Sequence, residues 1–98
     1  MKEIKWSVLK SERLKRTRGV SFEEILTAKL IDILSHPQKE NQKIMLFEYK
    51  AYIWLVPFID KEKGIFLKTL YPSRKYTKVY KKRRKNDQNK SLFNNNMS

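Results

Sequence analysis

Residues 68–75 place cations and hydroxyl groups where a helix is expected to begin. Pro72 presets its own φ near the helical value, and Ser73 is then the predicted N-cap of a helix that starts at Arg74. Arg74 and Lys75 occupy the first turn, where the helix dipole makes cations unfavourable unless an anion binds. Free backbone N–H groups, a hydroxyl and two cations are together the components of a phosphate site.

The chain contains few residues that are typical of catalytic sites. His36 is the only histidine and is expected to cap its own loop, cysteine is absent, and the ten acidic residues show no spacing of a metal-binding carboxylate cluster. RNA can be cut without a metal, because its own 2′-hydroxyl attacks the neighbouring phosphate. The protein then has to orient atoms, stabilise the phosphorane charge and move protons, which arginine, lysine and tyrosine can do. No metal and no cofactor are expected.

The charge of the chain favours nucleic acid as the partner. The net charge is +13, and residues 81–98 contribute six cations and one anion, so residues 1–80 carry +8. An acidic protein is the second partner class and an anionic membrane the third. Aromatic residues that could stack on bases interleave with the cations: Tyr49, Tyr52, Trp54, Tyr71, Tyr76 and Tyr80. Core packing is expected for Trp6, Phe22, Phe47 and Phe66, and remains open for Tyr52 and Trp54.

The N-terminal third of the chain predicts a short strand and a basic helix. Apolar residues alternate with polar ones over residues 4–8, as in a strand. Residues 7–18 then predict a helix with Leu9 and Leu14 turned inward, and Gly19 is a typical helix stop.

A second helix is predicted by a capping box. Ser21 and Glu24 have the required spacing, and Val20 and Ile25 can form a hydrophobic staple around the helix start. The helix is expected to run over residues 22–29. It should bury Phe22, Ile25 and Leu26.

The remaining chain predicts antiparallel strands and a final helix. Strands are expected at residues 30–34, 43–49, 52–59 and 64–70, joined by a loop at His36-Pro37, a tight turn near Lys50 and a hairpin loop at residues 60–64. Pro57 cannot donate to a ladder, so it predicts an edge or a bulge. The last helix should bury Tyr76, Val79 and Tyr80. The predicted fold is α+β, with one domain over residues 1–85 and a flexible Asn-rich tail at 86–98.

Two segments resemble a known family. Lys5-Trp6, the basic helix, and Arg18-Gly19-Val20-Ser21-Phe22-Glu23-Glu24 resemble the start of BrnT-type toxins, small members of the RelE-like ribonuclease superfamily. The strands and the segment Thr69-Leu70-Tyr71-Pro72-Ser73-Arg74-Lys75 are similar to the family's later layout. The resemblance covers roughly residues 4–80. Tyr76 stands where the family often has alanine, and Ser7-Val8-Leu9-Lys10 where it is often acid-rich.

The resemblance implies a RelE-like α+β domain that acts as the toxin of a type II toxin–antitoxin pair. It implies a metal-independent endoribonuclease that cleaves mRNA, free or on the ribosome, and so inhibits translation. It also implies a cognate antitoxin that masks the basic face and binds promoter DNA. The expected catalytic residues are Arg74, Lys75 and Lys68. The residues expected to contact phosphate or base are Thr69, Ser73, Tyr52, Trp54 and Tyr80.

Two other interpretations explain the same charge: a non-enzymatic nucleic-acid-binding module, and a basic protein that pairs with an acidic partner. A neighbouring reading frame for a small acidic or DNA-binding protein would favour the toxin.

The chain shows no apolar signal core and no run of transmembrane length, so a cytoplasmic location is expected. If Pro57 marks an exposed strand edge, Tyr52, Trp54 and Phe58 are candidate apolar anchors for the antitoxin.

Overall fold

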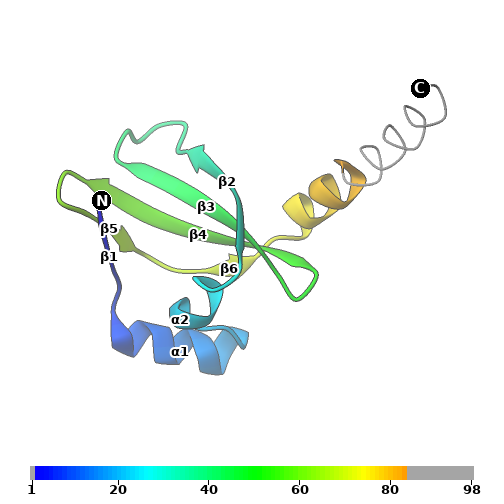
Figure 1. Ribbon diagram of the computed structural model, residues 1–98, viewed down its shortest axis with the longest axis horizontal. Helices are drawn as coiled ribbons and strands as arrows, with labels where there is room; N and C mark the ends of the chain where they lie inside the picture. Colours follow the sequence, from blue (N-terminus) through cyan, green and yellow to red (C-terminus); the bar gives the residue numbers. More distant parts are fainter. Residues whose placement is uncertain (1, 84–98) are drawn as a thin grey trace.

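The computed structural model describes residues 2–83, and its fold is α+β as predicted. Helices α1 (Val8–Arg18) and α2 (Phe22–Ile25) cover one face of a six-stranded sheet, and a C-terminal helix (residues 74–83) follows the last strand (Figure 1). The strands are β1 (Glu3–Lys5), β2 (Lys29–Ser35), β3 (Gln42–Tyr49), β4 (Tyr52–Lys61), β5 (Gly64–Leu67) and β6 (Tyr71–Pro72). The predicted tail at 86–98 and the predicted domain end at 85 lie outside the described residues. None of the described helices is long and apolar enough to span a membrane.

Helix α1 has the predicted stop but not the predicted inner face. Gly19 adopts a left-handed φ of 80°, and its N–H donates to the Lys15 carbonyl. Leu14 is buried as expected, whereas Leu9 is exposed, which corrects the prediction. Ser11, about 200° around the helix from Leu9, is buried instead. Its hydroxyl accepts from the Phe22 N–H at 3.0 Å, so α1 is joined to α2 by a hydrogen bond as well as by apolar packing.

The capping box of α2 is present as predicted. The Ser21 hydroxyl accepts from the Glu24 N–H at 3.1 Å, and the Glu24 carboxylate accepts from the Ser21 N–H at 3.2 Å. Val20 and Ile25 are buried in one cluster, as expected for the staple. The helix nevertheless ends at Ile25 rather than near Lys29, because Lys29 already pairs with Glu48 of β3.

The same capping carboxylate predicts a pH dependence of stability. The ion pair with Lys15 at 2.8 Å, together with the hydrogen bonds from Ser21, lowers the pKa of Glu24 from 4.5 to about 2. A carboxylate with a lowered pKa stabilises the fold above its unfolded pKa, and this stabilisation is lost as the pH falls through the folded pKa. We expect Glu24→Gln to lower the thermal midpoint at pH 7, and we expect this difference to shrink between about pH 4.5 and pH 2. A difference that stays constant down to pH 2 would contradict the assignment.

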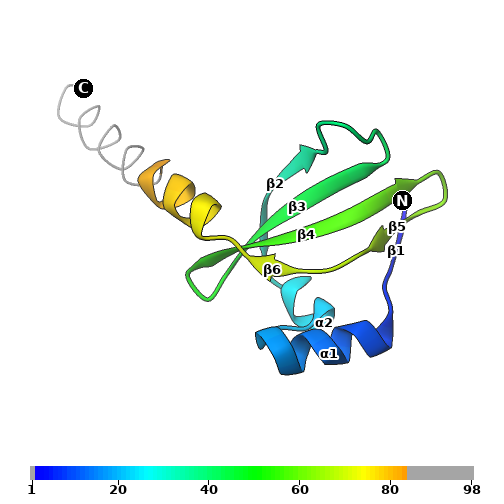
Figure 2. The ribbon, with the colours of Figure 1, turned by 180° about the vertical axis from the view of Figure 1, so that it is seen from behind.

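The sheet has the strand order β1-β5-β4-β3-β2, and β6 pairs with β4 beyond the end of β5 (Figure 2). All pairs are antiparallel except β1 with β5, which run parallel and were not anticipated from the sequence. Strand β1 is shorter than predicted, since α1 already begins at Val8. A Cβ atom at Gly64 would lie 2.8 Å from the Glu3 carbonyl oxygen, so the close approach of β1 requires glycine there.

Pro57 lies in an interior strand, at a break in its pairing. Its carbonyl accepts from the Lys68 N–H at 2.9 Å, between the β5 and β6 ladders. The predicted irregularity is therefore present, but an exposed edge is not, because β3 flanks β4 on its other side. Trp54 and Phe58 are consequently buried in the core beneath α1 and α2. The expectation that they form an exposed anchor for an antitoxin is wrong.

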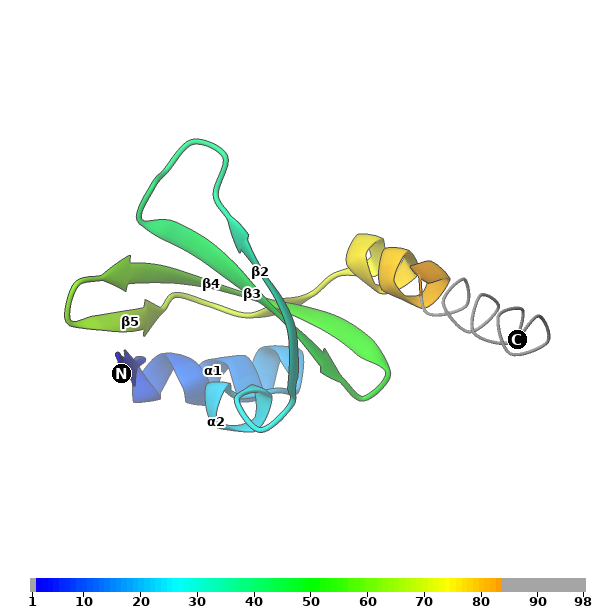
Figure 3. The same ribbon diagram turned by 45° about the horizontal axis from the view of Figure 1, so that its top comes forward.

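Two apolar clusters lie on the two faces of the sheet. The larger one joins the sheet to α1 and α2, which lie together on one side (Figure 3). The opposite face, here called the open face, carries Leu46, Ile53 and Leu55, against which Tyr71, Tyr76 and Tyr80 pack. Phe66 was predicted to be core, but it is 43% exposed. Its neighbour Leu67 is buried under the helices, and side chains alternate along a strand, so Phe66 lies on the open face.

Candidate nucleic-acid interface

The turn that leads into the C-terminal helix has the predicted geometry. The Ser73 N–H donates to the Ile53 carbonyl of β4 at 2.9 Å. The Ser73 hydroxyl accepts from the Tyr76 N–H at 3.1 Å, which is the bond of an N-cap to the third helical residue. Ser73 is thus the N-cap, and the helix begins at Arg74 as predicted.

Thr77 fixes this turn to the sheet, and sequence reasoning missed it. Thr77 is buried, with only 5% of its surface exposed. The hydroxyl donates to the Ser73 carbonyl at 2.6 Å and accepts from the Ile53 N–H at 2.9 Å. Both backbone polar groups of Ile53 are therefore bonded to the turn. Val79, predicted to be buried, is exposed, because the helix turns Thr77 rather than Val79 towards β4.

Arg74 and Lys75 project from the start of this helix. Both are exposed, and neither forms an ion pair within residues 2–83. The Lys75 ammonium lies 5.6 Å from the centre of the Tyr76 ring. Since the cap already uses the Tyr76 N–H, the donors available to an anion are the two side chains and the first N–H groups of the helix. The arrangement can bind a phosphate and stabilise charge that develops on it.

Lys68 and Thr69 lie along the same side of β4 as the Ser73 turn, but at a distance from it. The Lys68 N–H bonds to Pro57, and the Ser73 N–H bonds to Ile53. These partners are four residues apart on β4, or about 13 Å at 3.3 Å per residue. The structure thus separates Lys68 from the Ser73 turn, and it does not bring Lys68 and Arg74 together at one point.

The predicted aromatic contacts are divided between the two faces of the sheet. Tyr52 and Trp54 lie on the face covered by α1 and α2. Trp54 is only 9% exposed, so its ring offers no surface for stacking, and its indole Nε1 has no hydrogen-bond partner among residues 2–83. Tyr80 lies on the open face with the C-terminal helix. The structure does not bring these three rings into one site.

Tyr80 joins the C-terminal helix to the sheet. Its hydroxyl donates to the Asp32 carboxylate of β2 at 2.9 Å. Burial, and then this hydrogen bond, raise the pKa of Tyr80 above its ordinary value. The Arg83 guanidinium lies 5.3 Å from the centre of the ring. The raised pKa keeps the Tyr80 hydroxyl protonated at neutral pH, so that it can donate the hydrogen bond that attaches the helix to β2.

Arg18 is a further residue that sequence reasoning did not assign to the site. Its guanidinium donates to the Leu70 carbonyl and lies 6.0 Å from the centre of the Tyr71 ring. The last turn of α1 is thereby attached to the segment that leads to the Ser73 turn. Arg18 occurs in the family-like motif quoted above, but only the fold reveals its position beside β6.

His36 acts in its loop as expected, since its Nδ1 accepts from the Gln38 N–H at 3.1 Å. Among residues 2–83, no group of three or more histidine, aspartate or glutamate side chains is arranged to hold a metal ion. At the Ser73 turn itself, the side chains that can contact a phosphate are cations and hydroxyls.

Comparison with known proteins gives one structural similarity. No family model matches the sequence, and no curated protein matches it significantly. Among solved structures, the chain is similar to the Brucella abortus ribonuclease toxin BrnT, with 19% identity and a TM-score of 0.49, over 74% of this chain and 97% of that chain.

Proposed function

We propose that this chain is a ribonuclease toxin of the BrnT type that cleaves RNA at the Ser73 turn. The observation that carries the proposal is the pair of exposed, unpaired cations Arg74 and Lys75 at a helix start that is bonded to β4. Cations in this turn are unfavourable for the helix itself, and a bound phosphate removes that penalty. The charge of +8 on residues 1–80 supports a polyanionic substrate.

The proposed reaction is transesterification within RNA. The 2′-hydroxyl loses its proton to solvent as its oxygen attacks the adjacent phosphorus, the bond to the 5′-oxygen breaks, and the 5′-oxygen takes up a proton from solvent. Arg74 donates hydrogen bonds to the non-bridging oxygens as negative charge builds on them. Lys75 and the hydroxyl proton of Ser73 can position the same phosphate, while Lys68 holds a neighbouring one.

The proposed biological role follows from this activity. Cleavage of mRNA, free or on the ribosome, inhibits translation in the cytoplasm. A cognate antitoxin would neutralise the toxin by covering its basic face, and it would carry the DNA-binding function at the shared promoter. The apolar contribution to that interface cannot come from Trp54 or Phe58, because both lie in the core.

Cleavage is expected to proceed in the presence of EDTA. The proposed mechanism uses only side chains and the 2′-hydroxyl, so chelation should leave the rate unchanged. The purified protein is incubated with a labelled RNA, with and without EDTA, and the product ends are identified as 2′,3′-cyclic phosphate or 3′-phosphate. Activity that is lost on chelation and restored by magnesium would rule out this mechanism.

A non-enzymatic nucleic-acid-binding module is the second candidate. Residues 74–83 contain six cations and no acidic residue, which favours phosphate contacts along the whole helix. This candidate predicts binding that weakens steeply with added salt, but no cleavage of RNA under any condition tested. If the wild type forms RNA cleavage products and the Arg74→Ala variant does not, the protein is a ribonuclease and the binding-module candidate is excluded.

A further inference from the structure

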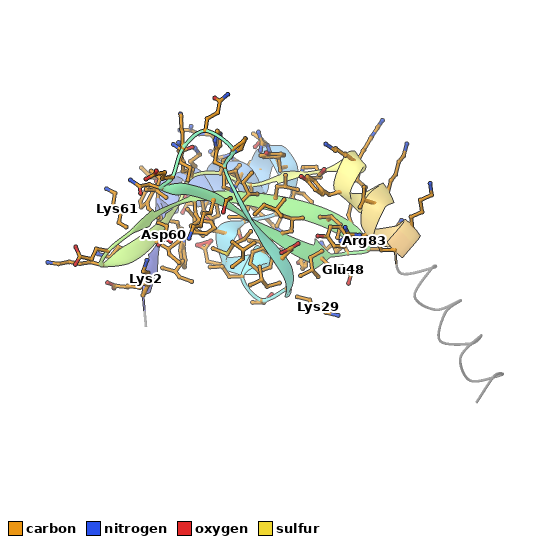
Figure 4. The ribbon with its side chains drawn as sticks, turned by 90° about the horizontal axis from the view of Figure 1, so that it is seen from above. Lys2, Lys29, Glu48, Asp60, Lys61 and Arg83 are labelled. Atoms are coloured by element: carbon orange, nitrogen blue, oxygen red, sulfur yellow. The ribbon has the colours of Figure 1, made fainter. Side chains whose placement is uncertain are left out.

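A hollow of about 350 Å³ lies on the sheet beside the exposed ring of Phe66. Gly64 and Phe66 of β5 line it together with Glu3 and three lysines, Lys5, Lys61 and Lys63. Figure 4 shows Lys61 and Arg83 at opposite ends of the sheet, so this hollow is remote from the C-terminal helix. We refer to it as the Phe66 hollow.

Strand register explains why the hollow exists. Gly64 lies between Glu3 of β1 and Lys61 of β4 in one cross-strand row, and it contributes no side chain to that row. In the next row on the same face, Phe66 lies between Lys5 and Ile59. The exposed Phe66 side chain therefore lies beside a row whose central position has no side chain.

The charges around the hollow are not balanced by the protein. Lys5 lies 3.7 Å from the Glu3 carboxylate, whereas Lys61 and Lys63 form no ion pair among the described residues. The lining carries three cations and one anion. An exposed aromatic ring flanked by unpaired lysines fits a base with its neighbouring phosphates.

The hollow is aligned with the Ser73 turn along one side of β4. Phe66 pairs with Ile59, Lys68 bonds to Pro57, and Tyr71 pairs with Leu55. These β4 partners alternate along the strand with the buried helix-side residues, so all three side chains belong to the open face. The Arg18 guanidinium lies 6.0 Å from the centre of the Tyr71 ring, which adds a cation beside that residue. Aromatic and basic residues thus follow one another from the hollow to the turn.

We infer that the Phe66 hollow is a second RNA-contacting site, in which an unpaired base stacks on Phe66 while the same strand reaches the Ser73 turn. The inference rests on the proposed function for the identity of the ligand. Ile59 and Ile53 are the β4 partners of the two sites. The distance between them along the strand is about 20 Å at 3.3 Å per residue. A single strand of four or more nucleotides spans such a surface, in the range of single-strand-binding modules. A duplex does not offer an unstacked base, so single-stranded RNA is the preferred ligand.

The test compares two substitutions at Phe66 in the full chain. The probe is a fluorescent 12-nucleotide 2′-O-methyl RNA, which cannot be cleaved because its 2′-oxygen is blocked, and its dissociation constant is measured by anisotropy. We expect Phe66→Leu, which keeps an apolar side chain without a π-face, to bind about 5- to 150-fold more weakly. Phe66→Tyr keeps the ring and should bind like the wild type. Circular dichroism and the thermal midpoint verify that both variants fold.

The lysines provide a second and independent readout. Lys61→Gln should lower the slope of log affinity against log salt by about one, because one phosphate contact is lost. Lys39→Gln removes the same charge from the loop between β2 and β3 and should leave the slope closer to that of the wild type. Ultraviolet crosslinking of the unmodified RNA sequence should label the peptide that contains Phe66.

The outcomes separate this inference from the proposed function. If the Phe66→Leu variant binds the RNA as tightly as the wild type, and no crosslink forms at Phe66, the second site is ruled out. The proposal of cleavage at the Ser73 turn is not affected by that result. Failure of the wild type to bind the RNA would overturn both. A last outcome is that the Phe66→Leu variant loses affinity for a Leu-containing polyglutamate peptide but not for RNA. The hollow would then bind an acidic protein segment, and the inference would be wrong.

Discussion

Replacing Arg74 with alanine is expected to abolish growth inhibition when the protein is expressed in a bacterium, while the fold is retained. Arg74 is exposed and forms no ion pair within residues 2–83, so its removal leaves no buried group without a partner. Loss of one preorganised donor to a developing charge costs roughly 10²- to 10³-fold in rate. Cleavage of a labelled RNA by the purified variant measures that loss directly.

Three further variants make this result specific to the Arg74 side chain. Arg74→Lys keeps the charge but not the planar fork, and we expect intermediate activity. Arg74→Glu places an acid in the first helical turn, which should raise the thermal midpoint and still remove activity. Arg13→Ala deletes an exposed arginine of α1 and serves as the matched control. Toxicity of Arg74→Ala equal to that of the wild type, at matched expression, would exclude Arg74 as the catalytic cation.

Replacing Thr77 with valine is expected to lower the free energy of unfolding by about 1–3 kcal/mol. Valine has nearly the same shape, but it leaves the buried Ile53 N–H without its acceptor and the Ser73 carbonyl without the hydroxyl donor. Of the two hydrogen bonds between the turn and Ile53, only the one from the Ser73 N–H then remains. We therefore expect a lower cleavage rate as well, since Arg74 is positioned less precisely.

Thr77→Ser is the control for this substitution, because it keeps the hydroxyl and removes only a methyl group. Urea denaturation gives the stabilities, and single-turnover cleavage at a temperature where both variants are folded gives the rates. If Thr77→Val were as stable and as active as Thr77→Ser, the two hydrogen bonds of the hydroxyl would have no role in positioning the turn.

The two predictions together describe how the fold prepares the turn. A helix that begins with two cations is weakened at that end by its own dipole. The Ser73 cap and the Thr77 hydroxyl offset part of this cost without using the exposed donors. The turn therefore stays formed while the side chains of Arg74 and Lys75 remain exposed.

Sequence by itself determined the features that depend on a few neighbouring residues. The caps at Ser21 and Ser73 and the stop at Gly19 were predicted correctly, because each is made by a side chain or a backbone conformation within four residues. The order of strands and helices also followed from local periodicity and turn residues, except that the strand predicted at residues 64–70 ends at Leu67 and the two-residue β6 was not predicted.

The tertiary structure alone decided which surfaces are covered. Alternation shows that a strand has two faces, but it cannot show which face the helices cover, and Phe66 was misplaced for that reason. Pro57 could not be assigned to an interior strand before the partners of β4 were known. Likewise, the bonds of Arg18 to Leu70 and of Thr77 to Ile53 join residues that are distant in the chain. Contacts of this kind arise only when the packed sheet brings those segments together, so no local pattern encodes them.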